Sequence, residues 1–84
     1  MTQDQIIAIV RRNQSPEPVF EIRFKTRSPM KGLFIKSTDY QELSRKNFWR
    51  VVSERNIEEF KETRDENLAR IYNGMEFTGL DSKA

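Results

Sequence analysis

The sequence predicts an α+β protein in which an N-terminal helix packs on a small five-stranded antiparallel barrel. Three observations lead to this prediction: a capped apolar segment begins at Thr2, an apolar–polar alternation begins at Val19, and short β-rich runs follow it. The 84 residues leave room for one hydrophobic core. Residues 1–80 are therefore expected to form a single domain, with residues 81–84 as a disordered tail.

The first element is a helix over residues 3–12. Thr2 and Gln5 have the spacing of a capping box, in which each side chain binds the backbone amide of the other residue. Aliphatic residues within the range 6–10 give the segment an apolar side, and two arginines at 11–12 complement the carbonyl groups of the last turn. A segment with two prolines then ends the helix.

Residues 19–25 predict the first strand. Phe20, Ile22 and Phe24 alternate with charged residues, so that three large apolar side chains share one face. Leu33–Ile35 predicts a second strand. The short connection between the two strands makes them an antiparallel hairpin.

A helical turn and a third strand follow. Thr38 and Gln41 repeat the capping-box spacing, which predicts a short helical turn through Leu43 that Asn47 closes. Residues 48–52 are mainly aromatic and β-branched, which favours a third strand with both faces partly covered.

The rest of the chain predicts a short helical insertion before the last two strands. Asn56 is expected to cap a helix that begins at Ile57, because the Asn side chain is a good acceptor for the first helical amides. Residues 68–72 then form a fourth strand, an Asn-Gly pair at 73–74 makes a tight turn, and residues 75–80 form the fifth strand.

One helix over residues 57–72 is the alternative for this segment. Its apolar residues also fit the stripe of an amphipathic helix, and the glycine that follows could end it. We favour the helix followed by a strand, since residues 65–67 are poor helix formers.

The alternating strands predict which side chains fill the core. All belong to the four strands that must share one apolar interior. They are Phe20, Ile22, Phe24, Leu33, Ile35, Trp49, Val51 and Ile71.

The composition argues against several functions. The chain has no Cys and no His, which removes the commonest ligands and nucleophile–base pairs. We therefore predict a protein that is not an enzyme, with no catalytic residue, no metal and no cofactor. The acidic residues within 58–66 are interpreted as a solvated helix face. No apolar run is long enough for a membrane, so a cytoplasmic location is expected.

Charge is distributed unevenly along the chain. Residues 1–50 hold ten Lys and Arg against five Asp and Glu, whereas residues 51–84 hold five against eight. The first half could form a basic face that attracts phosphate groups, or the clusters could be ordinary solvated surface.

Two short motifs resemble the Sm-like family, and most of all its Hfq-like branch. The run from Ile6 to Tyr40 has a helix that ends in two arginines, an alternating strand, and then Gly32, Ser37 and Asp39 in the manner of the family's G-x-h-x-S-x-D motif, with one extra residue between Gly and Ser. The segment IYNGMEF looks like its second motif. The resemblance implies an SH3-like barrel that binds single-stranded RNA and forms a homo-oligomer through its strand edges.

This resemblance, together with the positions of charged and aromatic residues, predicts a set of RNA-binding residues. Cations are expected to attract phosphates, a tyrosine to stack on a base, and two amides to read base edges. The cations are Arg11, Arg12, Arg23 and Lys25, the tyrosine is Tyr40, and the amides are Gln41 and Asn73.

A protein-interaction adaptor with a small α+β fold is the alternative function. The acidity of the second half favours it, as does Asn73, which stands where the Sm-like motif usually has a basic residue. In that case the partner is a protein and nucleic acid has no role.

Overall fold

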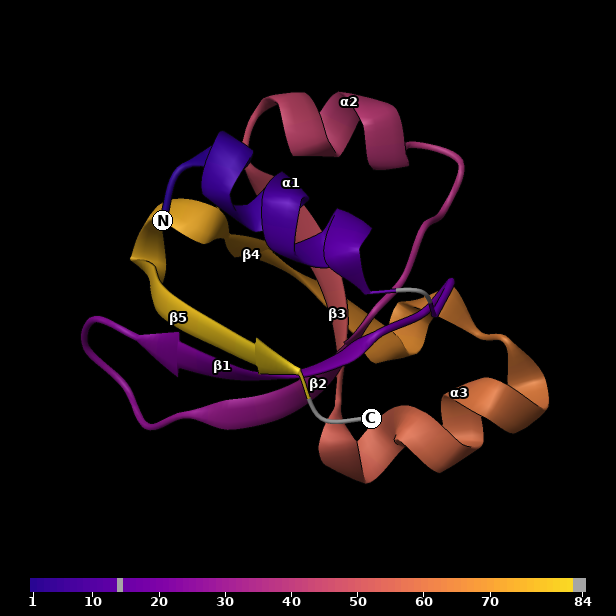
Figure 1. Ribbon diagram of the computed structural model, residues 1–84. Helices are drawn as coiled ribbons and strands as arrows, with labels where there is room; N and C mark the ends of the chain where they lie inside the picture. The colour runs from indigo at the N-terminus through magenta and orange to yellow at the C-terminus, as the bar shows by residue number, and fades with distance from the viewer. Residues whose placement is uncertain (14, 83–84) are drawn as a thin grey trace.

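The computed structural model describes residues 1–13 and 15–82. Its helices are α1 (Gln3–Arg12), α2 (Tyr40–Arg45) and α3 (Ile57–Thr63), and its strands are β1 (Val19–Phe24), β2 (Met30–Phe34), β3 (Phe48–Ser53), β4 (Ala69–Asn73) and β5 (Phe77–Ser82). The strands form one antiparallel sheet in the order β4-β3-β2-β1-β5. The helices α1 and α2 lie on one side of this sheet and α3 lies on the other (Figure 1). The predicted α+β class is confirmed.

The sheet is not closed into the predicted barrel. Within the described chain, β4 pairs with β3 and β5 pairs with β1, but β4 and β5 do not pair with each other. The predicted Asn-Gly tight turn is also wrong: such a turn needs positive φ at both central residues, whereas Asn73 has φ −84° and no described glycine has positive φ. A 3-10 turn at Gly74–Glu76 instead carries the chain across to β1.

Asn47 and Gly74 fix the place where the chain crosses. The Gly74 amide donates to the Asn47 carbonyl at 2.8 Å, and a Cβ atom on Gly74 would lie 2.5 Å from the Ile6 side chain. Asn47 has φ 63°, a conformation that Asn tolerates better than most residues. Its amide oxygen accepts from Trp49 Nε1 at 2.8 Å, and its amide nitrogen donates to the Met1 carbonyl at 3.0 Å. Asn47 therefore closes the turn after α2, as predicted, and its side chain also joins Met1 at the N-terminus to Trp49 of β3.

The first two helices show one confirmed cap and one incorrect cap. The helix α1 covers the predicted residues, and the Thr2–Gln5 capping box is formed. The helix α2 begins two residues after Thr38, and its N-cap is Asp39, whose side chain makes no capping hydrogen bond. The second predicted capping box is wrong because the Asp39 carboxylate accepts from Arg50 and Ser37 instead.

The helix α3 begins at Ile57 as predicted, but Asn56 does not cap it with its side chain. A 3-10 turn precedes the helix and holds Asn56 at ψ 0°, so this residue lacks the extended backbone typical of a capping residue. Its amide nitrogen donates to Ser53 Oγ at 3.4 Å. The helix ends before Arg64, whose φ is 56°, and the alternative of one continuous helix is wrong.

The sheet carries a hydrophobic cluster on each face. The larger cluster joins α1 to the sheet through buried residues such as Ile6, Phe20 and Trp49, and Tyr72 of β4 packs against it. The smaller one contains Leu33 and packs Phe60 of α3 against β2 and β3. Two layers of helix and one sheet thus share the apolar residues of a short chain.

Most of the predicted core is confirmed. Phe20, Ile22, Leu33, Ile35, Trp49 and Val51 are buried. Phe24 is only half-buried at the end of β1. The prediction for Ile71 is wrong, since its side chain is 48% exposed on the edge strand β4, where no further strand covers it.

Two residues of the predicted disordered tail, Asp81 and Ser82, extend the sheet instead. Asp81 pairs with Glu21 and Ser82 pairs with Phe20, so both belong to β5. Residues 83–84 lie outside the described residues. Across the described part of the chain, no helix has the length and apolar character needed to cross a membrane.

Candidate functional site

The end of α1 and the start of α2 carry part of the predicted RNA-binding set. We call the exposed and half-exposed residues Arg11, Arg12, Lys36, Tyr40 and Gln41 the helical surface. The Tyr40 ring is half-buried, and Lys36 Nζ lies 5.6 Å from the ring centroid. Burial raises the pKa of Tyr40, while the positive charge of Arg11 acts in the opposite direction. Two cations, Arg11 and Lys36, are therefore close to one aromatic side chain.

The Tyr40 ring is held in place from below. It packs edge-on against Trp49, with 6.0 Å between the ring centroids. Trp49 is 1% exposed and belongs to the larger hydrophobic cluster. The position of Tyr40 is therefore set by the core, and only part of its ring can meet a ligand.

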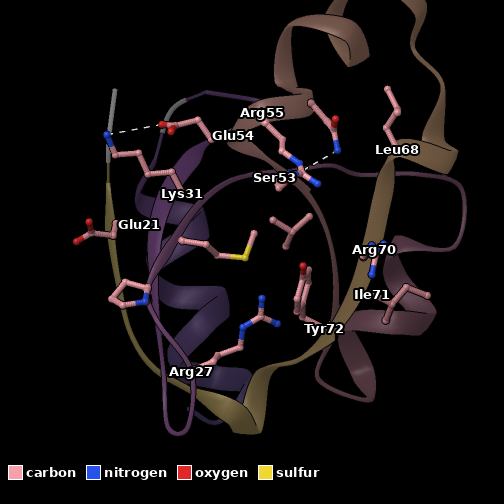
Figure 2. Close-up of a pocket in the computed structure, with 14 residues that line it drawn as sticks. Glu21, Arg27, Lys31, Ser53, Glu54, Arg55, Leu68, Arg70, Ile71 and Tyr72 are labelled. Carbon is pink, nitrogen blue, oxygen red and sulfur yellow. Dashed lines mark hydrogen bonds and ion pairs between the residues drawn. The ribbon is translucent and has the colours of Figure 1, made fainter.

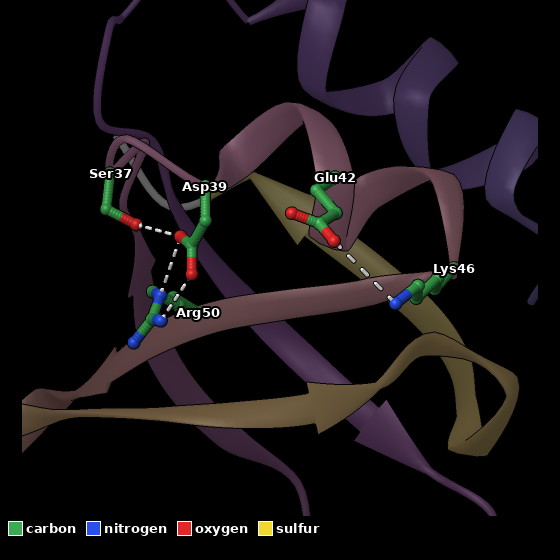
Figure 3. A network of polar contacts seen from close by, with 5 residues as sticks. All are labelled: Ser37, Asp39, Glu42, Lys46 and Arg50. Carbon is green, nitrogen blue, oxygen red and sulfur yellow. Dashed lines mark hydrogen bonds and ion pairs between the residues drawn. The ribbon is translucent and has the colours of Figure 1, made fainter.

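Asp39 orders the loop that leads to Tyr40. Its carboxylate accepts from Arg50 at 2.7 and 3.2 Å and from Ser37 Oγ at 2.7 Å (Figure 3). These hydrogen bonds favour the ionised form and lower the pKa of Asp39 to about 2. A longer contact of 3.9 Å joins Lys46 to Glu42 along α2 (Figure 3). The start of α2 is thus tied to β3 by a charged group that is not free to bind a ligand.

The other predicted site residues lie elsewhere. Arg23 forms an ion pair with Asp81 of β5, which neutralises much of its charge. Lys25 is exposed beyond the end of β1. The Asn73 side chain accepts from the Met75 amide at 2.9 Å, so it stabilises the turn after β4. The structure does not bring these three residues to the helical surface.

A cleft of about 850 Å³ lies between β4 and the hairpin of β1 and β2. It is lined by residues of β1, the β1–β2 connection, β2, β3, the 3-10 turns after β3 and before β4, and β4; among them are Arg27, Arg55, Arg70, Tyr72 and Met30. Figure 2 shows the guanidinium groups of Arg27 and Arg55 directed toward the hollow from opposite sides, with Tyr72 between them. We call this hollow the β4 cleft.

Sequence reasoning did not find the β4 cleft. Arg55 and Arg70 belong to the acidic half of the chain, and Arg70 is brought to the cleft by the pairing of β4 with β3, in which it lies opposite Val51. Arg27 closely follows the alternating first strand, but it was not among the residues predicted to bind RNA. The register of β4 cannot be read from the local sequence.

Neither surface has the ligand set of a metal site. Among the described residues, no three His, Cys, Asp or Glu side chains come together in a way that could hold a metal ion. Comparison of the chain with family models, with curated proteins and with solved structures gives no match. The chemistry of the two surfaces is therefore the basis for a functional proposal.

Proposed function

We propose that this protein is a non-enzymatic, Sm-like RNA-binding module that holds single-stranded RNA on the helical surface. The observation that carries the proposal is the cationic neighbourhood of Tyr40: Lys36 Nζ lies 5.6 Å from the ring centroid, and the positive charge of Arg11 opposes the rise in the pKa of Tyr40. Single-stranded RNA combines phosphates with unstacked bases, so cations beside a partly exposed aromatic ring suit it.

The charges of the helices on the two faces of the sheet support the placement of RNA on the helical surface. The helices α1 and α2 together carry three arginines and two carboxylates, whereas α3 carries three glutamates and one lysine. A polyanion is therefore attracted to the side of α1 and α2 and repelled by the side of α3.

The open sheet supports the proposed homo-oligomer. The outer edges of β4 and β5 have no partner strand within the described chain. Unpaired edges can add a strand from another molecule, so these two edges are proposed to pair between copies of the protein.

The test is binding of a mixed-sequence single-stranded RNA at low and at moderate salt. A double variant, Arg11→Ala with Arg12→Ala, should weaken binding and reduce the salt slope by roughly 0.7 log unit for each lost phosphate contact. Tyr40→Leu keeps an apolar group against Trp49 but removes the stack, which costs about 1–3 kcal/mol of binding and leaves the salt slope unchanged.

Lys61→Ala is the matched control, because Lys61 is an exposed cation on the opposite side, in α3. It should leave RNA binding unchanged. If the unmodified protein does not bind RNA even at low salt, or if Lys61→Ala weakens binding as much as the Arg11 and Arg12 changes, the proposal is wrong.

A protein-interaction adaptor is the second candidate. It is favoured by two large apolar side chains on the surface, Ile71 and Met75, which are 48% and 50% exposed. The two residues lie in β4 and in the turn that follows it, and a protein partner that covers both would bury their apolar surface. Absence of RNA binding by the unmodified protein, even at low salt, would leave this candidate.

A further inference from the structure

We propose that the β4 cleft is a second binding site, which takes a nucleoside phosphate. The phosphate would meet the arginine side chains of the cleft, and the base would lie against Tyr72. The proposal goes beyond the function given above, because it uses none of the residues of the helical surface.

The β4 cleft has more cations than its neighbouring carboxylates can neutralise. Four cations line the cleft, and one of them, Lys31, pairs with Glu54 at 3.7 Å. Within residues 1–13 and 15–82, the other three, Arg27, Arg55 and Arg70, have neither an ion pair nor a side-chain hydrogen bond. Glu21 is the one other carboxylate in the lining. The cleft therefore has more positive charge than negative, as a phosphate site requires.

One wall of the β4 cleft contains the aromatic ring of Tyr72. The side chain of Tyr72 is half-buried and stands in the wall of the cleft (Figure 2). Its ring lies 5.9 Å from the ring of Phe24 at an angle of 47°, and this contact fixes its orientation. Met30 and the buried Val51 add apolar surface. An aromatic ring with apolar neighbours favours a ligand with a flat ring over a phosphate ion alone.

Arg27 connects the charged and aromatic parts of the cleft. Its guanidinium carbon lies 4.9 Å from the centroid of the Phe24 ring and 5.8 Å from that of Tyr72. The rings hold the guanidinium by cation–π attraction, which leaves its hydrogen-bond donors free for an anion. An arginine placed in advance in this way loses less conformational entropy when a phosphate binds.

The size and origin of the cleft are consistent with a mononucleotide. Its volume of about 850 Å³ falls within the range of small-molecule sites, roughly 300–1,000 Å³. The cleft exists because the sheet is not closed: within residues 1–13 and 15–82, β4 pairs only with β3, and the β1–β2 connection stands opposite it. The side chains of a closed barrel would fill this space.

The ligand could be a free nucleotide or one nucleotide of a strand, and the chemistry of recognition is the same. The test uses ¹⁵N-labelled protein titrated with AMP, with UMP, with adenosine, with inorganic phosphate and with a short oligoadenylate. AMP or UMP should shift the amide signals of Arg55, Arg70 and Tyr72. Adenosine and inorganic phosphate should each bind at least roughly tenfold more weakly than AMP, because each lacks one half of the ligand.

Arg55→Gln and Arg70→Gln test the charge, since both side chains are exposed and unpaired and can be replaced without loss of folding. Each should weaken AMP binding roughly tenfold, as expected for one lost charge-assisted hydrogen bond. Tyr72→Leu should reduce the preference for AMP over inorganic phosphate. Arg45→Gln removes an equal charge from α2, outside the cleft, and should change nothing.

The outcomes separate this proposal from the proposed function. The Arg11→Ala, Arg12→Ala double variant should bind AMP normally even if it no longer binds long RNA. Binding of AMP identifies a free nucleotide as the source of the ligand, whereas binding of the oligoadenylate alone, with the same signals shifted, identifies a strand. If neither shifts these signals, or if Arg55→Gln and Arg70→Gln bind as the unmodified protein does, the cleft is not a nucleoside phosphate site.

Discussion

Asp39 shows at the scale of one residue how a charge can position a surface without belonging to it. Its two carboxylate oxygens accept from Arg50 of β3 and from Ser37, so the side chain is committed to hydrogen bonds within the protein. Because Tyr40 follows directly, the orientation of the Tyr40 backbone depends on these contacts. Loss of the Asp39 charge is thus expected to affect stability.

The stability contributed by Asp39 should depend on pH. The bonds from Arg50 and Ser37 lower its pKa from 3.8 to about 2 in the folded protein. A carboxyl group with a lowered pKa stabilises the fold above its unfolded pKa, and this contribution disappears as pH falls from 3.8 toward 2. We expect Asp39→Asn to lower the free energy of unfolding most at neutral pH, with a difference that shrinks over this interval. Urea unfolding of both proteins across the pH range measures it.

Glu42→Gln is the control for Asp39→Asn. The Glu42 side chain is 73% exposed and lies 3.9 Å from Lys46, a contact that contributes little in water. This variant should unfold like the unmodified protein at every pH. A difference for Asp39→Asn that stays constant between neutral pH and pH 2 would contradict the role given to its charge.

Residue roles could be predicted where they depend on near neighbours in the chain. The Thr2 cap was predictable because its partner is three residues away. Asn47 was expected only to close a turn, yet it also binds Met1 and Trp49, and the contact with Met1 spans 46 residues. Asn56 failed as a cap because the preceding 3-10 turn changed its backbone, and the sequence gives no sign of that turn.

At the scale of elements, Arg64 separates α3 from the chain that leads to β4. It has φ 56°, a left-handed conformation that costs a residue with a Cβ about 1–2 kcal/mol. Its guanidinium donates to both Glu17 carboxylate oxygens, at 2.9 and 2.6 Å, and lies 4.6 Å from the centroid of the Phe60 ring. These contacts join the end of α3 to the segment before β1 and offset part of the strain.

Replacement of Arg64 should therefore reverse the usual order of alanine and glycine. Arg64→Ala loses the contacts with Glu17 and Phe60 and keeps the strain, whereas Arg64→Gly loses both. We expect the free energy of unfolding of Arg64→Gly to be about 1 kcal/mol higher than that of Arg64→Ala, measured by urea unfolding. At Thr63, the last residue of α3, alanine should be the more stable replacement because glycine disfavours helix. The same order at both positions would contradict this account.

The elements were largely predictable, and their pairing was only partly so. Period-two alternation located β1, and the breaker-rich residues 65–67 correctly favoured a strand over a continuous helix. The partner of β5 was not predictable. The Asn-Gly pair favours a hairpin locally, but the close packing of Gly74 against Ile6 and Asn47 imposes another turn. Ile6 is far from Gly74 in the sequence, so local rules could not include this contact.

At the scale of the whole molecule, the two candidate binding surfaces differ in how far the sequence could indicate them. Arg11, Tyr40 and Gln41 come from two segments whose helices were expected, so part of the helical surface followed from the sequence. The β4 cleft depends on the pairing of β4 with β3 and on the absence of closure. Arg55 and Arg70 come together only through that pairing, and an average over the acidic half of the chain conceals them.

The unpaired edges should decide the mass of the protein in solution. Ile71 is 48% exposed on the edge strand β4, and an edge strand that has no partner among the described residues favours pairing with a second copy. We expect the unmodified protein to form an oligomer, with a mass of at least twice the 10.0 kDa of one chain, measured by light scattering on a size-exclusion column. Ile71→Lys should shift it toward 10.0 kDa, because a lysine on an edge strand opposes pairing. Met75→Lys places the same charge on a residue that is 50% exposed but lies in the turn after β4, and it should leave the mass unchanged. If the unmodified protein has a mass of 10.0 kDa at all concentrations, with and without RNA, the strand edges remain unpaired and the proposed homo-oligomer is wrong.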